Sequence, residues 1–392
     1  MISLLLTIIY LAFISLGLPD TLLGAAWPSM YPGLGVPMAY SGILSFIISA
    51  GTVVSSLMSD RLTRRLGTGR VTAISVGMTA AALFGFSVSN SFPLLCMWAI
   101  PYGLGAGSVD AALNNYVALH FPSRHMSWLH CMWGIGASVG PYIMGFALGQ
   151  KAGWPLGYRI IGLIQLVLTA LIVLTLSQWK EKNAASEAKT AETSKFLGLG
   201  GILRISGAKE ILVMFFCYCA MEHTINLWAS SYLVLGKGIS PEAAAKFASL
   251  FFLGITLGRV ASGFLTLRFS DAQMIRLGQG IIALGLGCLL LPLGDGTALA
   301  GLMILGLGCA PIYPSIIHGT PYYFGADRSQ AIIGMEMASA YIGSCFAPPL
   351  FGFLAEHLRI ALFPFFLLML LAFMVILHRA LLRQTRKENE NA

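Results

Sequence analysis

Charged residues are scarce in this chain. Asp, Glu, Lys and Arg make up 10% of its 392 residues, whereas soluble domains carry roughly 25%. Hydrophobic residues make up 57% of the chain. This balance excludes an ordinary soluble domain and predicts an integral membrane protein.

The chain also lacks the residue sets that metal centres and enzymes need. Its seven cysteines fall in apolar stretches, and none has a metal-ligand spacing with a histidine. There is no zinc-binding His-Glu-x-x-His motif, and Glu222 and His223 are sequence neighbours that point about 100° apart on a helix. We therefore expect no metal, no cofactor and no enzymatic activity.

Long apolar stretches dominate what is present. A membrane-crossing helix needs about 20 apolar residues, and twelve stretches qualify. No Lys or Arg precedes the first stretch and no small-residue cleavage pattern follows it, so we expect a retained helix and not a signal peptide. The predicted spans are 2–28, 38–58, 70–89, 93–119, 127–149, 158–178, 208–234, 242–266, 273–292, 297–318, 329–355 and 358–380.

One long polar segment separates the sixth span from the seventh. Residues 179–207 are rich in Lys, Glu, Ala, Ser and Thr, which is typical of a linker. The sequence thus predicts an N-terminal six-helix bundle (1–178), a cytoplasmic linker (179–207), a C-terminal six-helix bundle (208–382) and a cytoplasmic tail (383–392).

An internal repeat relates the two predicted bundles. With an offset of 207, Gly136 and Pro141 align with Gly343 and Pro348. The same offset aligns Gly51, Ser55 and Arg61 with Gly258, Ser262 and Arg268, and an offset of 203 aligns Gly103-Leu104-Gly105 with Gly306-Leu307-Gly308. Three pairs of spans match in consistent order. This predicts an all-α membrane protein whose halves are related by a pseudo-two-fold axis along the membrane normal, as in secondary transporters.

Basic residues in the short loops predict the orientation. If both termini lie on one side of the membrane, that side collects eighteen Lys and Arg residues and the other side only five. The side richer in Lys and Arg faces the cytoplasm. We therefore expect an inner-membrane protein with both termini in the cytoplasm, and we attribute the net charge of +8 to topology and not to nucleic-acid binding.

Four acidic residues fall inside predicted spans: Asp20, Asp110, Glu222 and Glu336. Ionisable groups at membrane depth are costly and mark functional sites by default. Asn114 lies one helical turn after Asp110, and Asn226 lies one turn after Glu222. Glu336 and Arg259 lie at similar depth and are expected to form a buried ion pair. His120, His125, His357 and His378 lie near loop ends, where we expect them to be solvated.

The segment Ser59-Asp60-Arg61-Leu62-Thr63-Arg64-Arg65 resembles the Asp-Arg-x-x-x-Arg core of the loop between helices two and three in the major facilitator superfamily. Ser56 replaces the glycine four residues before the Asp, so the match is partial. Gly258-Arg259 and Gly263 with Arg268 look like a degenerate second copy. The resemblance covers the whole chain.

Within that superfamily the chain resembles proton-coupled sugar symporters of the fucose permease and glucose/mannose permease type. Four segments carry this resemblance: Leu18-Pro19-Asp20, Gly103 to Asn114, His130 to Pro141, and Glu222 to Tyr232. It implies roles for Asp20 in substrate recognition and proton coupling, and for Asp110 in proton translocation, where the family has a glutamate. His130 and Trp133 replace a glutamine and an asparagine of fucose permease.

The resemblance and the residue chemistry together give one candidate site. Sugars have hydroxyls and apolar faces, so a sugar site needs amides, carboxylates or imidazoles beside aromatic rings. Asp20, Asp110 and Glu222 are the proton-coupling candidates. The substrate-binding candidates are Asp20, Asn114, His130, Glu222, Asn226, Trp228 and Tyr232. Asn115, Gln165 and His223 fit hydrogen bonding between helices equally well.

The leading hypothesis is proton-coupled uptake of a monosaccharide or similar small polar solute by a monomer in the lipid bilayer. The alternative is proton-driven efflux of amphiphilic compounds, because Gly136 to Gly145 around Gly140-Pro141 resembles an antiporter signature. A membrane-embedded enzyme and a nutrient sensor are less favoured. Asp60, Arg61, Arg65, Arg259 and Glu336 are the gating candidates.

Overall fold

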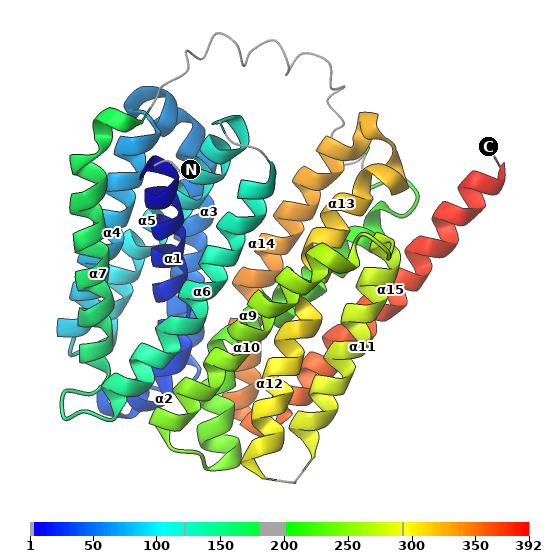
Figure 1. Cartoon of the computed structure of the whole chain (residues 1–392). Coiled ribbons are helices and arrows are strands. Elements are labelled where there is room, and N and C mark those ends of the chain that lie inside the picture. The colour runs from blue at the N-terminus through cyan, green and yellow to red at the C-terminus, as the bar shows by residue number, and fades with distance from the viewer. Residues whose placement is uncertain (1–3, 121–122, 180–200, 202, 292–293, 392) are drawn as a thin grey trace. The chain divides into compact units, whose positions relative to one another are not determined.

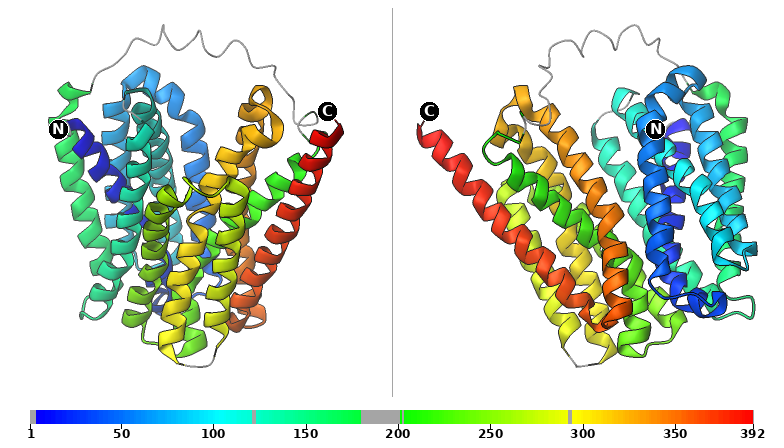
Figure 2. Two further views of the ribbon diagram at one scale, coloured as in Figure 1. Left: turned by 45° about the vertical axis from the view of Figure 1, so that its right-hand side comes forward. Right: turned by 180° about the vertical axis from the view of Figure 1, so that it is seen from behind.

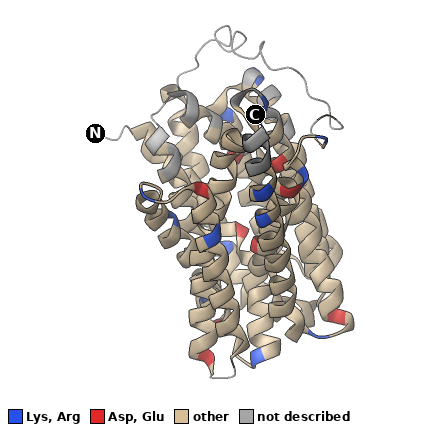
Figure 3. Ribbon diagram, turned by 90° about the vertical axis from the view of Figure 1, so that its right-hand side faces the viewer, with Lys and Arg blue, Asp and Glu red and all other residues tan. Residues whose placement is uncertain are grey.

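The structure is a computed structural model, and it describes residues 4–120, 123–179, 201, 203–291 and 294–391. In these ranges it contains helices and no strand. Charged residues, coloured on the ribbon in Figure 3, are sparse along the helices. The predicted linker falls mostly outside the described residues.

The helices follow the predicted spans closely (Figure 1). In the first half they are α1 (Leu4–Asp20), α2 (Leu22–Leu34), α3 (Tyr40–Leu66), α4 (Thr68–Val88), α5 (Phe92–His120), α6 (Ser123–Leu148) and α7 (Trp154–Leu174). The second half has α9 (Ala208–Lys237), α10 (Pro241–Leu265), α11 (Asp271–Leu290), α12 (Asp295–Cys309), α13 (Ile312–Phe324), α14 (Ala326–His357) and α15 (Phe363–Asn391). Eleven described stretches are long and apolar enough to cross a membrane, and Tyr40–Ser56 is a shorter apolar one. The predicted all-α membrane fold is confirmed.

Two predicted spans are broken helices. The first consists of α1 and α2 with Thr21 between them, and the tenth consists of α12 and α13 with Ala310 and Pro311 between them. Pro311 has no backbone N–H to donate and so favours an interruption at this point. Hydropathy averaged over a window does not register such breaks, which is why each was predicted as one continuous span.

Two prolines free backbone carbonyls that side chains from elsewhere then satisfy. A proline inside a helix leaves the carbonyl four residues earlier without its usual donor. Pro19 does this to Ser15, whose carbonyl accepts from the Gln165 amide Nε2 at 2.5 Å. Pro141 does the same to Ala137, whose carbonyl accepts from the Thr21 hydroxyl at 3.2 Å. These bonds tie α1, α6 and α7 together around the first helix break.

The aligned glycines of the repeat serve matching contacts. A Cβ on Gly136 of α6 would collide with the backbone of Ile14 and Leu18 on α1. A Cβ on Gly343 of α14 would lie 2.6 Å from the Phe216 carbonyl oxygen on α9. Each glycine therefore lets the fifth helix of its half approach the first helix closely, as small residues do in membrane interfaces.

The chain forms two compact units. The first contains Met1–Asn183, Asn226–Leu253 and Gly352–Ala361, and the second contains Ala184–Ile225, Gly254–Phe351 and Leu362–Ala392. In the first unit α3 packs on α5, α4 on α5 and α7, and α1 on α6. In the second unit α11 packs on α12, α13 and α15, which Figure 2 shows from two further sides. The predicted bundle boundaries at residues 178, 207 and 382 stay a prediction.

Candidate functional site

Asp20 is the centre of a polar group in the first unit. It is the last residue of α1, directly before the break at Thr21, and its side chain is partly buried. Its Oδ2 accepts a hydrogen bond from Trp133 Nε1 on α6 at 2.9 Å, and its Oδ1 accepts a longer one from the Tyr102 hydroxyl on α5 at 3.5 Å. The carboxyl group is thus held between an indole and a phenol.

Asn226 joins this group through the backbone. Its Nδ2 donates to the Asp20 carbonyl oxygen at 3.2 Å. The final carbonyls of a helix lack partners within the helix, and a side-chain amide is one way to satisfy them. Close packing makes the bond possible, because a Cβ on Gly24 of α2 would collide with the Asn226 carbonyl oxygen.

Asp110 and Asn114 form the hydrogen-bonded pair that their spacing on α5 predicts. Asn114 Nδ2 donates to Asp110 Oδ1 at 2.9 Å and to the Asp110 carbonyl oxygen at 3.0 Å. The first unit therefore contains two acidic groups, one at the end of α1 and one on α5.

The remaining substrate-binding candidates of the first unit have different surroundings. His130 is exposed, and its ring packs edge-on against Phe13 at a centroid distance of 5.9 Å. Trp228 is fully buried and fills the space beside Gly352. Tyr232 is buried with Lys237 Nζ 6.0 Å from its ring centroid. Contact of these three side chains with a solute stays a prediction.

Glu222 and Arg259 are two candidate residues of the second unit. Glu222 is partly exposed on α9, one turn before Asn226. Arg259 is partly buried on α10 in the same unit. The roles of both residues stay a prediction.

The structure gives Glu336 a different partner from the one predicted. Its Oε1 lies 2.8 Å from the Thr320 hydroxyl oxygen on α13, and its Oε2 has no hydrogen-bond partner among the described residues. The expected ion pair with Arg259 is therefore corrected to a hydrogen bond with an uncharged residue. The sequence offered no signal for this contact, because Thr320 and Glu336 belong to different helices.

The other gating candidates lie at the end of α3. The structure describes the backbone of Asp60 and Arg61 as helical, and their side chains lie outside the described residues. Arg65 is exposed, one residue before the last residue of α3. Their gating role stays a prediction.

Sequence reasoning missed Tyr102 and Trp133 as partners of Asp20. Both lie in helices of the first unit that contain other candidates, and the resemblance marks Trp133 only as a replacement for an asparagine. A small, mainly apolar cavity also reaches Tyr102. No cluster of metal-ligating side chains occurs in the described part of the chain.

A family model described as Major Facilitator Superfamily matches residues 9–317 and 211–392. The probable nitrate/nitrite antiporter NarK1 of Thermus thermophilus is 26% identical, over 95% of this chain and 91% of that protein. The glucose/mannose transporter GlcP of Bacillus subtilis is 21% identical, over 78% of this chain and 77% of that protein.

Bypass of stop codon protein 6 of Saccharomyces cerevisiae is 25% identical over 67% of this chain, and the match spans 56% of that protein. Among solved structures, a mutant of the nucleoside transporter NupG superposes with a TM-score of 0.78 at 14% identity, covering 97% of this chain and 100% of that one. At this identity the structural likeness concerns the fold.

Proposed function

The chain belongs to the Major Facilitator Superfamily of secondary transporters, and from this premise we propose that it takes up a sugar-like polar solute together with protons. The solute is a monosaccharide or a compound with similarly arranged hydroxyl groups. The carrier works by alternating access and accumulates the solute at the expense of the proton gradient.

The polar group around Asp20 supports this proposal most directly. The Trp133 indole N–H and the Tyr102 phenol lie within hydrogen-bond distance of the Asp20 carboxyl group, and the Asn226 amide lies within hydrogen-bond distance of its backbone carbonyl oxygen. A carboxylate accepts hydrogen bonds from hydroxyls, and aromatic rings cover the apolar faces of a sugar. No Lys or Arg is among the described hydrogen-bond partners of the Asp20 carboxyl group. This chemistry fits a neutral polyhydroxylated solute better than an anion.

Proton coupling follows from the two acidic groups of the first unit. Moving an ionised carboxylate through a low-dielectric environment costs more than moving the neutral acid. Protonation at Asp20 or Asp110 removes one of two negative charges from the predicted spans of the first unit, which favours the conformational change of the loaded carrier. Glu222 is a third candidate for this role, on α9 in the second unit.

The second candidate function is proton-driven efflux of amphiphilic compounds. Its support is the Gly140-Pro141 pair of α6, which packs directly against α1, since a Cβ on Gly140 would collide with the Leu18 carbonyl oxygen. This pair lies in the segment that resembles the antiporter signature of helix five.

A thermal-shift series on the purified protein separates the two functions. A ligand that binds only the native state raises the unfolding temperature. We expect a rise with at least one member of a panel of hexoses, pentoses, deoxysugars and sugar alcohols, and none with cationic amphiphiles. A rise with the amphiphiles alone would instead support efflux, and proteoliposomes with an imposed proton gradient then fix the direction of transport.

The oligomeric state and the orientation of the carrier in the membrane complete its proposed function. We propose that it functions as a monomer in the cytoplasmic membrane with both termini in the cytoplasm. The excess of Lys and Arg in one set of loops supports this orientation.

A further inference from the structure

Glu336 of α14 is an acidic residue buried away from solvent. None of its surface is exposed in the second unit. Thr320 is its described hydrogen-bond partner, and its second carboxyl oxygen is buried without one among the described residues. An ionised carboxylate in such a place is very costly unless a cation pairs with it. The neutral acid avoids most of this cost.

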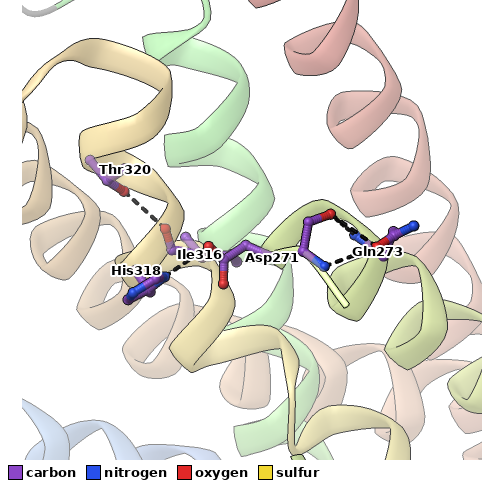
Figure 4. Close-up of polar contacts among 6 residues, drawn as sticks. Asp271, Gln273, Ile316, His318 and Thr320 are labelled. Atoms are coloured by element: carbon purple, nitrogen blue, oxygen red, sulfur yellow. Dashed lines mark hydrogen bonds and ion pairs between the residues drawn. The ribbon is translucent and has the colours of Figure 1, made fainter. Parts of the chain in front are cut away.

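The hydrogen bonds of Thr320 point to the same state of Glu336. The Thr320 hydroxyl oxygen lies 2.8 Å from Glu336 Oε1 and 2.9 Å from the carbonyl oxygen of Ile316, one turn earlier on α13. Figure 4 shows the second of these contacts. A threonine hydroxyl has a single hydrogen. The Thr320 hydrogen can serve either Ile316 or Glu336 fully, but not both. Both contacts are satisfied together when the hydrogen goes to the Ile316 carbonyl oxygen, which only accepts, and the Thr320 oxygen accepts from Glu336.

The donor to Thr320 must then be Glu336 itself. Both distances lie in the usual range for O–H···O hydrogen bonds. A protonated carboxyl group supplies one O–H donor, and its other oxygen is an uncharged carbonyl. This series of hydrogen bonds, from Glu336 to Thr320 and from Thr320 to Ile316, uses each hydroxyl hydrogen once. Only Glu336 Oε2, which is uncharged in the neutral acid, stays unpaired among the described residues.

We propose that Glu336 is a proton-binding site and that its bound proton forms the hydrogen bond that joins α14 to α13. This site is separate from the carboxyl groups that the proposed function uses for coupling, which are Asp20, Asp110 and Glu222. Proton loss at Glu336 removes the donor of this bond and leaves a buried charge. It therefore loosens the contact between the two helices within the second unit.

Other titratable groups lie on the helices next to Glu336. Next to Thr320 on α13, His318 Nδ1 pairs with Asp271 of α11 at 2.8 Å, and the His318 side chain is 83% exposed. The α9 helix contacts α14 where Ser339 donates to the Leu212 carbonyl oxygen.

Near that contact on α9, the Glu210 carboxylate accepts from Gln384 of α15 at 2.8 Å. The other described titratable groups on α9, α13 and α14 are Lys209, Cys217, Tyr218, Cys219, Glu222, His223, Tyr232, Lys237, Tyr313, Tyr322, Tyr323, Arg328, Tyr341, Cys345, Glu356 and His357. Arg259 lies on α10 and His378 on α15. The described hydrogen-bond partner of the Glu336 carboxyl group is Thr320, which is not titratable.

Infrared spectroscopy of the purified full-length protein in lipid nanodiscs tests the proposal. A protonated carboxylic acid has a C=O stretching band that a carboxylate lacks. At neutral pH we expect a band in the wild type that Glu336→Gln removes, that Thr320→Val shifts in frequency and that Thr320→Ser leaves in place. Equal carboxylic-acid bands in the wild type and Glu336→Gln would overturn the proposal.

The pH dependence of stability gives a second readout. A proton that the folded state holds and the unfolded state releases above about pH 4.3 makes stability fall as pH rises. The wild-type unfolding constant should therefore increase by up to about tenfold per pH unit relative to Glu336→Gln. His318→Gln, which removes the exposed imidazole nearby, should keep this difference.

A parallel pH dependence of wild type and Glu336→Gln would contradict the proposal. If Glu336→Gln does not fold, the comparison of Thr320→Val with Thr320→Ser decides. The valine variant lacks the acceptor, so the proton is held less firmly, and the pH-dependent fall in its stability should end at a lower pH and be smaller in total than in the serine variant. Identical profiles for these two variants also reject the site. Neither readout depends on transport, so a failure here is distinct from a failure of the proposed uptake function.

Discussion

Single polar residues in this chain derive their roles from partners far away in sequence. Gln165 fitted either a ligand contact or a bond between helices from sequence, and it satisfies a carbonyl that Pro19 frees. His125 was expected to be solvated, yet it is 8% exposed and its Nδ1 lies 2.7 Å from the Tyr10 hydroxyl oxygen. The same prediction was wrong for His378, which is 1% exposed. Proximity to a loop end therefore predicted solvation correctly for His357, which is exposed, and wrongly for His125 and His378.

Asp110→Asn tests proton coupling. The amide oxygen of the new Asn can still accept from Asn114, so the local hydrogen bond survives while the titratable group is lost. We expect loss of accumulation against a gradient with solute exchange retained. Uptake and counterflow in the same proteoliposomes measure the two activities. Active uptake at the wild-type level would exclude Asp110 as the coupling residue.

Trp133→Phe tests the hydrogen bond to Asp20. An aromatic ring remains, and the indole N–H that donates at 2.9 Å is removed. Hydrogen bonds to charged groups contribute about 1.5–3 kcal/mol, so solute binding should weaken about ten- to a hundredfold if Asp20 contacts the solute. Tyr102→Phe is the matched control, because its 3.5 Å contact is weaker. A larger loss from Tyr102→Phe in equilibrium binding would reject this ranking.

The existence and length of the helices could be predicted from the sequence, whereas the helix breaks and the contacts between helices mostly could not. Apolar runs of sufficient length specify where the chain crosses a membrane, and the described helices overlap every predicted span. The break at Thr21 arises where local prolines and contacts with α6 act together, which a window of hydropathy does not register. The glycine repeat, by contrast, correctly marked Gly136 and Gly343 as equivalent, because close helix approach restricts residue size at both positions.

A double-mutant cycle tests the link between Pro19 and Gln165. Gln165→Leu leaves the Ser15 carbonyl without its side-chain donor, which should cost about 1–3 kcal/mol of unfolding free energy. Pro19→Ala restores a backbone N–H that reaches the same carbonyl. The loss from Gln165→Leu should therefore be smaller in the Pro19→Ala background. Additive effects on the free energy of unfolding would show that the two residues act independently.

Gly136→Ala tests the close approach of α6 to α1. The added methyl group would overlap the backbone of Ile14, so neither helix can keep its position. We expect strong loss of folded protein in fluorescence-detected size-exclusion chromatography. Gly287→Ala on α11 is the control, because a Cβ added there would have no other group within 4 Å among the described residues. Comparable losses in both variants would point to a general effect of replacing helical glycine.

For the molecule as a whole, the fold followed from composition and repeat, whereas the site only partly did. Hydrophobic content and the repeat constrain every helix at once, and the family match agrees with them. The site depends on individual contacts such as Trp133 with Asp20 and Thr320 with Glu336, which join different helices. Residue type predicted that Glu336 is special, and only the surrounding helices determine that its partner is uncharged.

The orientation of the chain gives a prediction that concerns all the loops together. Lys and Arg resist translocation, so the side with eighteen of them should face the cytoplasm. In a background without native cysteines, we expect Lys151→Cys in the exposed loop between α6 and α7 to react with a membrane-impermeant maleimide on intact cells. Arg268→Cys, in the exposed segment between α10 and α11, should react only after the cells are permeabilised. The reverse pattern would invert the proposed topology and with it the direction assigned to proton-driven uptake, whereas labelling of both cysteines on intact cells would show a mixed orientation and weaken the charge argument itself.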